Sequence, residues 1–183
     1  EAQGVSVDFT EPAEAQSIIL EAIKDLDIKC VLATDDSCVS LSNQIAQVLD
    51  LAHNKPSAAI LTHRKDLARK AAQNFGCNTP EYQVVKLQQS NQCANSVTYP
   101  VVIKPLSLSA SKGVIRANNR QQFNSACTTI DIILNKSNIT GYERNHVLVE
   151  GYLDGLEFAV DGILIDGEFH LLAIFDKPEP LIG

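Results

Sequence analysis

The chain has 183 residues, 45% of them hydrophobic and 20% charged, and a formal net charge of −7. This composition is typical of a soluble globular protein with one large or two small domains, and the acidic balance argues against nucleic acid or acidic membrane surfaces as partners. No apolar run approaches the roughly 18 residues that a membrane-spanning helix needs, and the first residues do not resemble a signal peptide.

The five cysteines are odd in number and form no C-x-x-C pair. The sequence therefore predicts neither a zinc site nor a disulfide framework, and we expect a reducing, cytoplasmic location. The sequence also contains no methionine, so we expect residue 1 to be internal to a longer gene product.

A helix is predicted to begin at Thr10, where a hydroxyl cap is followed by a proline in the first turn. Its apolar stripe consists of Ile18, Ile19, Ala22, Ile23 and Leu26. Residues 29–34 are predicted to form a buried strand, and residues 39–51 a second amphipathic helix. The order helix, strand, helix is typical of part of an open α/β sheet.

After a connector at 54–57, a helix is predicted over 64–75, with Thr62 as its cap and an apolar stripe that ends at Phe75. Gly76 stands where a left-handed residue commonly ends a helix. Residues 86–98 are polar and are predicted to form an irregular surface loop.

The second half of the chain alternates strands with one long helix. Strands are predicted at 100–104 and 113–117, then a helix at 121–134, then strands at 146–152, 157–165 and 168–175. The apolar face of the helix contains Phe123, Cys127, Ile130 and Leu134. Asp166-Gly167 is a strong signal for a two-residue hairpin turn.

Two lysines are candidates for binding phosphate. Lys104 ends an apolar strand just before the hydroxyl-rich loop 107–113, so a point charge lies next to backbone N–H and hydroxyl donors. The spacing is not that of a Walker A loop. Lys65 lies in the first turn of a helix, where a cation opposes the helix dipole and an anion is a suitable partner. Taken alone, each lysine could instead be a solvated surface residue.

Two glutamates flank a short connector, since Glu150 ends one predicted strand and Glu157 begins the next. Carboxylates accept hydrogen bonds from amino groups and diols, such as adenine N6 and the ribose hydroxyls. The alternative is a pair of solvated glutamates beside a turn.

The joint order of these features resembles the ATP-grasp superfamily of carboxylate–amine and carboxylate–thiol ligases. Within it the chain is most similar to the carnosine-synthase and amino-acid ligase branch, which is related to carbamoyl-phosphate synthase and biotin carboxylase. The matching segments are Asp35-Asp36, 63–69, 76–80, 99–105, 109–114, 150–157 and Asp176-Lys-Pro178.

The resemblance implies an α/β fold in four parts. Residues 1–55 would end a Rossmann-like domain that precedes the ATP-grasp domain, and 56–98 would be a linker with a central helix. Residues 99–153 would form the α+β lid subdomain, and 154–183 the truncated start of the catalytic core.

The resemblance also implies roles for individual residues in binding ATP. Lys65 and Lys104 would contact phosphates, with Lys104 also facing the adenine side. The loop with Ser109, Ser111 and Gly113 would cover the β- and γ-phosphates. Glu150 would accept from adenine N6, the Tyr152 backbone and the Leu153 side chain would border the base, and Glu157 would hold the ribose.

The family reaction forms an acylphosphate from ATP and a carboxylate, and an amine or thiol then displaces phosphate. The expected partners are therefore ATP, a small carboxylate and a nucleophile, with a homo-oligomer possible. The catalytic residues and the ligands of Mg²⁺ are expected after Gly183, so the fragment alone should be inactive. No metal ligand is assigned in this chain, because turn or surface roles suit Asp161, Asp166 and Asp176 better.

Two alternatives remain at this stage. The phosphate loop contains fewer glycines than is usual for the family, which fits a nucleotide-binding regulatory or assembly module without catalysis. The other alternative is an unrelated α/β protein in which these lysines and glutamates lie on the surface.

Overall fold

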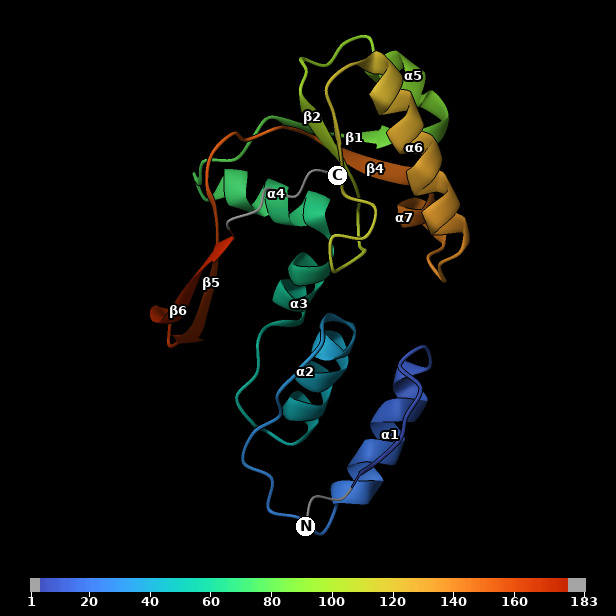
Figure 1. The fold of residues 1–183 in the computed structure, drawn as a ribbon. Coiled ribbons are helices and arrows are strands. Elements are labelled where there is room, and N and C mark those ends of the chain that lie inside the picture. The colour runs from blue at the N-terminus through green and yellow to red at the C-terminus, as the bar shows by residue number, and fades with distance from the viewer. Residues whose placement is uncertain (1–3, 178–183) are drawn as a thin grey trace. The chain divides into compact units, whose positions relative to one another are not determined.

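The structure is a computed structural model that describes residues 4–177 (Figure 1). It is a mixed α/β fold, as predicted, and its contacts divide into two compact units. Among the described residues, unit 1 comprises 4–79 together with Leu106–Lys112, and unit 2 comprises Pro80–Pro105 and 113–177. The four-part division expected from the sequence stays a prediction.

Unit 1 is helical. Its helices are α1 (Pro12–Ile23), the 3₁₀ turn η1 (Asp36–Cys38), α2 (Val39–Val48), α3 (Pro56–His63) and α4 (Lys65–Asn74). A small core of Ala15, Leu41 and Ile45 joins α1 to α2, and Ile19, Leu20 and Val31 pack against it. The predicted apolar stripe of the first helix is thus only partly buried, because Ile18 is 40% exposed and Leu26 lies beyond the helix end.

The predicted strand at 29–34 is wrong. No strand is assigned in this segment, and Cys30 and Leu32 are exposed. A strand needs a neighbour to complete its hydrogen-bond ladder, and no described segment of unit 1 pairs with these residues. Val31 alone reaches the core.

Both predicted hydroxyl caps are also wrong. The hydroxyl of Thr10 donates to Asp8 Oδ1, and the N-cap of α1 is Glu11. The hydroxyl of Thr62 donates to the Ala59 carbonyl inside α3, a helix that the sequence reading missed. At the other end of α4, Gly76 has φ +73°, as its predicted left-handed role requires, but Phe75 is 86% exposed rather than packed.

The described residues of unit 2 form a four-stranded antiparallel sheet, a two-stranded hairpin and three α-helices. The strands are β1 (Tyr82–Lys86), β2 (Val101–Pro105), β3 (Ile115–Ala117), β4 (His146–Gly151), β5 (Glu157–Ile165) and β6 (Glu168–Lys177). The sheet order is β1-β4-β2-β3, and β5 pairs with β6 alone among the described strands. The helical elements are η2 (Leu87–Gln89), α5 (Ser90–Cys93), α6 (Arg120–Asn135) and α7 (Gly141–Asn145).

Helix α6 covers one face of the four-stranded sheet (Figure 1). Successive side chains of a strand point to opposite faces of the sheet, so every second residue faces α6. On this face Val101, Ile103 and Val149 are almost completely buried. The predicted apolar face of the helix is confirmed, because Phe123, Cys127, Ile130 and Leu134 are all buried.

The predicted loop at 86–98 is wrong in part. The segment contains η2 and α5, and Ser90, Cys93 and Ala94 are buried. These small residues pack toward α6. The segment therefore has a buried side, which its largely polar composition did not indicate. Within residues 4–177, no helix is both long and apolar enough to cross a membrane.

Candidate functional site

The face of the sheet opposite α6 carries the charged candidates. Val102 pairs in register with Arg116 on β3 and with Glu150 on β4, so these three residues form one cross-strand row. Lys104 lies two residues further along β2 and therefore shares their face. We call Lys104, Arg116 and Glu150, with Tyr152 just after β4, the polar face.

Lys104 and Glu150 form an ion pair across β2 and β4. The Nζ atom lies 2.5 Å from Oε2, and the side chains are 20% and 3% exposed, respectively. A carboxylate this deeply buried requires a partner, and breaking a buried pair typically costs about 3–5 kcal/mol. The sequence analysis considered Lys104 and Glu150 separately, but in the structure they form one ion pair. The lysine can bind an anion, and the glutamate can accept a hydrogen bond from a donor.

Arg116 was not among the sequence candidates. Its guanidinium lies 3.9 Å from the centre of the Tyr152 ring, a cation–π contact, and its Nε donates to Asn118 Oδ1. The alternation Ile115-Arg116-Ala117 was a usable signal, because it predicts that Arg116 points to the face opposite that of its two apolar neighbours.

Backbone hydrogen bonds hold the end of β4 and the residue after it to the residues that directly precede β1 and β2. The Tyr152 N–H donates to the Pro100 carbonyl, and the Gly151 N–H donates to the Glu81 carbonyl. Leu153 is 71% exposed, so its side chain is accessible to a ligand. A planar group placed here would meet one fixed ring and one exposed aliphatic side chain.

In unit 1, Lys65 is tied to the loop Leu106–Lys112. Its backbone N–H donates to the Leu106 carbonyl, and its Nζ lies 2.5 Å from the Leu108 carbonyl oxygen. The structure thereby brings together a lysine and a loop that are about forty residues apart in the sequence. The ammonium group of Lys65 is therefore held next to this loop, where it could contact an anion bound by the loop.

The loop has an unusual backbone. Ala110 and Ser111 both have positive φ angles, 51° and 57°, which residues other than glycine seldom adopt. The Lys112 N–H donates to the Ser109 carbonyl, and the side chains of Ser109 and Ser111 are exposed. The hydroxyls that were predicted to face phosphate are therefore accessible, on a backbone that stores local strain.

Gly113 ends the loop where unit 2 resumes. Its φ is +75°, and a Cβ atom at this position would lie 2.9 Å from the Pro105 Cγ atom. The glycine at the end of this loop is therefore required by both conformation and space, and its role in binding nucleotide stays a prediction.

Next to Lys65, Arg64 and Asp66 form a bidentate ion pair, with donor–acceptor distances of 2.9 and 2.7 Å. Asp66 is almost completely buried. This pair fixes the first turn of α4, which begins at Lys65, and no sequence signal beyond adjacent opposite charges pointed to it.

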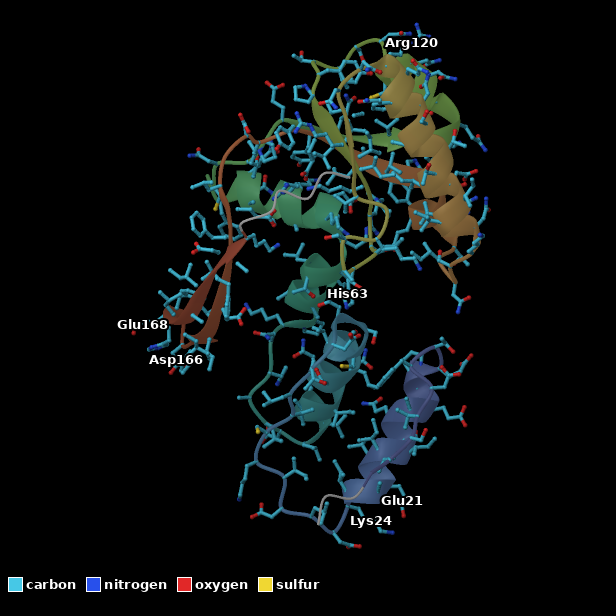
Figure 2. The ribbon with its side chains drawn as sticks, viewed as in Figure 1. Glu21, Lys24, His63, Arg120, Asp166 and Glu168 are labelled. Carbon is cyan, nitrogen blue, oxygen red and sulfur yellow. The ribbon has the colours of Figure 1, made fainter. Side chains whose placement is uncertain are left out.

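Glu157 lies on the β5–β6 hairpin, opposite Lys177 in register, and its Oε1 lies 2.6 Å from the Lys177 Nζ. Both side chains are partly exposed. The predicted hairpin turn is confirmed, because Asp166 and Gly167 have φ angles of 50° and 85°. Figure 2 shows Asp166 and Glu168 together at the tip of the hairpin.

Asp176 and Lys177 lie within β6 rather than after the last strand, so that part of the sequence interpretation is wrong, and Pro178 lies outside the described residues. Within residues 4–177, no three acidic, histidine or cysteine side chains gather as a metal site would require. The carboxylates Asp161, Asp166 and Asp176 are therefore not grouped around a cation.

Residues 97–180 match the profile of the ATP-grasp domain. This match bears out the resemblance to the ATP-grasp superfamily that the sequence predicted. The matched residues include every residue of the polar face. The match therefore argues against the alternative in which the chain is an unrelated α/β protein with these charged residues on its surface.

Individual ATP-grasp proteins show the same relation. The chain is 34% identical over 104 residues to a phosphoribosylamine–glycine ligase of Fusobacterium nucleatum, a stretch that covers 56% of this chain and 24% of that protein. The L-amino acid ligase of Bacillus licheniformis shares the fold, with a TM-score of 0.77 at 21% identity, over 94% of this chain and 42% of that one.

A biotin carboxylase domain from Hydrogenobacter thermophilus, whose structure contains MgADP, also shares the fold. Its TM-score is 0.64 at 12% identity, and the likeness covers 78% of this chain and 32% of that one. The chain spans between 24% and 38% of the length of the curated relatives that it matches.

Proposed function

We propose that this chain supplies the ATP-binding part of a ligase that joins a carboxylate to an amine or a thiol through an acylphosphate. The observation that carries the proposal is the buried Lys104–Glu150 pair on the polar face of an ATP-grasp domain. A cation and an acceptor at this position match the two ends of ATP that need recognition, the phosphates and the adenine amino group.

In the proposed complex, the Lys104 ammonium would contact phosphate while the Glu150 carboxylate accepts from adenine N6. In the structure, the two groups contact each other at 2.5 Å. Binding would therefore replace one ion pair by two charge-assisted hydrogen bonds, so the buried charges never lack partners. Tyr152, held in place by Arg116, and the exposed Leu153 would border the base.

In unit 1, Lys65 and the loop with Ser109 and Ser111 would meet the β- and γ-phosphates. The ammonium group is held by the Leu108 carbonyl, so little side-chain entropy would be lost when phosphate arrives. Glu157 would accept from the ribose hydroxyls after leaving Lys177, which a partly exposed pair permits at small cost.

The chemistry implied for the whole protein has two steps. A substrate carboxylate oxygen attacks the γ-phosphorus and ADP leaves; an amine or thiol then attacks the acyl carbon and phosphate leaves with that oxygen. Magnesium would neutralise charge on the phosphates. The described residues contribute nucleotide binding and orientation, and none of them is assigned to the transfer itself. A cytoplasmic location fits the five free cysteines.

Oxygen-isotope transfer tests this function. The whole protein, not this chain alone, is incubated with ATP, Mg²⁺ and a mixture of L-amino acids whose carboxylates carry ¹⁸O, and the released phosphate is analysed by mass spectrometry. An acylphosphate route moves one ¹⁸O atom into each phosphate released. Phosphate without ¹⁸O, despite amide formation, would contradict the acylphosphate.

A further inference from the structure

Unit 2 contains three Asp-Gly pairs, which are Asp154-Gly155, Asp161-Gly162 and Asp166-Gly167. An Asp-Gly pair is chemically labile, because glycine has no Cβ atom to keep its backbone nitrogen away from the aspartate carboxyl group. All three aspartates are exposed, so access to water does not distinguish them. The backbone around each pair therefore decides whether the glycine nitrogen and the carboxyl carbon can meet.

The pair Asp161-Gly162 lies inside strand β5. The register shifts by one residue between the two, yet Asp161 is opposite Ala173 and Gly162 is opposite Leu171, so β6 holds the chain on both sides of the bond that joins them. The strands are close here, since a Cβ atom on Gly162 would lie 2.8 Å from the His170 carbonyl oxygen. The rotation that brings the glycine nitrogen to the aspartate side chain therefore requires this part of the ladder to open.

The pair Asp166-Gly167 forms the two-residue turn of the same hairpin. Both residues have positive φ angles, 50° and 85°, as such a turn requires. The turn is closed by Ile165 and Glu168, which lie opposite each other. Attack by the Gly167 nitrogen would rotate Asp166 out of the turn conformation and open this end of the hairpin.

The pair Asp154-Gly155 lies in the connector 152–156 between β4 and β5 (Figure 1), which contains neither helix nor strand. In the described part of the chain, no hydrogen bond or ion pair involves the Asp154 carboxylate or the Gly155 N–H. A Cβ atom on Gly155 would meet nothing within 4 Å apart from its chain neighbours, and the flanking Leu153 and Leu156 are 71% and 88% exposed. Rotation of this pair therefore breaks no described contact.

We propose that Asp154 is a site of spontaneous isomerisation to isoaspartate, and that the fold confines this modification to the Asp154-Gly155 pair. The Gly155 nitrogen attacks the Asp154 Cγ atom, and a carboxyl oxygen leaves as water with one proton from the carboxyl group and one from the Gly155 N–H. Water then adds to the main-chain carbonyl of this succinimide and breaks its bond to the Gly155 nitrogen. No oxidant, reductant or other reactant takes part.

The product keeps the carboxylate but lengthens the main chain by one atom, because the chain then runs through Cβ and Cγ of residue 154. The two ends of the connector are held, since the Tyr152 N–H donates to the Pro100 carbonyl and Glu157 begins β5. The extra atom therefore changes the path of the connector between these two residues.

Ageing of the full chain, without ATP, tests this site. The folded chain is kept at neutral pH and physiological temperature for several weeks and is then cleaved after glutamate. This cleavage places Asp154 in peptide 151–157 and the other two aspartates in peptide 158–168, and mass spectrometry with electron-transfer fragmentation locates isoaspartate in each. We expect Asp154 to isomerise at least about tenfold faster than Asp161 or Asp166, because those two react only after local opening of the hairpin.

The same chain unfolded in urea is the control. All three pairs then have free backbones and should isomerise at similar rates, whereas Gly155→Ala in the folded chain should lose most of the isomerisation at Asp154, since a Cβ atom then crowds the nitrogen. The proposal is overturned if Asp154 is not the fastest site in the folded chain. It is also overturned if the advantage of Asp154 is as large in urea, which would assign it to the local sequence rather than to the fold.

Both comparisons use the parent chain and remain decisive if the variant does not fold. The measurement contains no nucleotide, so its failure would leave the proposed ATP binding intact. Loss of the proposed ATP binding would equally leave this modification unaffected.

Discussion

Removing Lys104 and removing Glu150 should destabilise the fold by different amounts. Lys104→Met leaves a carboxylate that is 3% exposed without its cation, whereas Glu150→Gln leaves an ammonium group that is 20% exposed and can reach water. We expect Lys104→Met to cost about 3–5 kcal/mol of unfolding free energy, the usual penalty for removing one member of a buried ion pair. Glu150→Gln should cost about 1–2 kcal/mol, because the amide oxygen still accepts from Lys104.

Urea denaturation followed by circular dichroism measures these differences. Lys86→Met is the matched control, because Lys86 is an exposed strand lysine in the same sheet, and it should change stability by no more than about 0.5 kcal/mol. The double variant Lys104→Met/Glu150→Leu should recover most of the loss, since no charge remains buried. Equal costs for the two single variants, or a double variant that is no more stable than Lys104→Met, would refute the reasoning.

Three further predictions concern other parts of the molecule. Lys65→Met should speed amide hydrogen exchange in Leu106–Lys112, because the ammonium group no longer holds the Leu108 carbonyl. Lys70→Met, which changes an exposed residue of α4, should leave that exchange unchanged. Equal exchange rates in the two variants would argue against a stabilising contact between Lys65 and the loop. At pH 8, Cys127 should react with iodoacetamide at least about tenfold more slowly than exposed Cys30, since burial both shields the Cys127 thiol and raises its pKa to about 11. Similar rates by mass spectrometry would contradict this. Glu157→Gln should weaken ATP more than an analogue that lacks the ribose, and equal losses in calorimetry would remove the ribose assignment.

The elements that the sequence predicted well are those with strong local signals. Strand β2, helix α6 and the β5–β6 hairpin each combine clear periodicity with an ending signal, as at Pro105 and Asp166-Gly167. Segment 29–34 has an equally apolar pattern, but no strand among residues 4–177 lies beside it, and a sequence pattern does not show which strands pair.

Individual site residues were predictable, but their partners were not. Lys104 and Glu150 each stood out at a strand end, yet their pairing depends on β2 lying beside β4 with Val102 opposite Glu150. The same register brings Arg116 onto the polar face. Such contacts join residues that are far apart in the chain, and only the sheet topology determines them.

Calorimetric titration with ATP tests the central claim most directly. Lys104→Gln keeps a hydrogen-bond donor for Glu150 but removes the charge, and Lys86→Gln changes an exposed lysine of the same sheet. The account predicts that ATP binds the parent chain and the Lys86 variant equally, and the Lys104 variant about 10- to 100-fold more weakly, as loss of a charge-assisted bond to phosphate requires. Equal ATP affinity in all three proteins would show that the nucleotide does not bind at the Lys104–Glu150 pair.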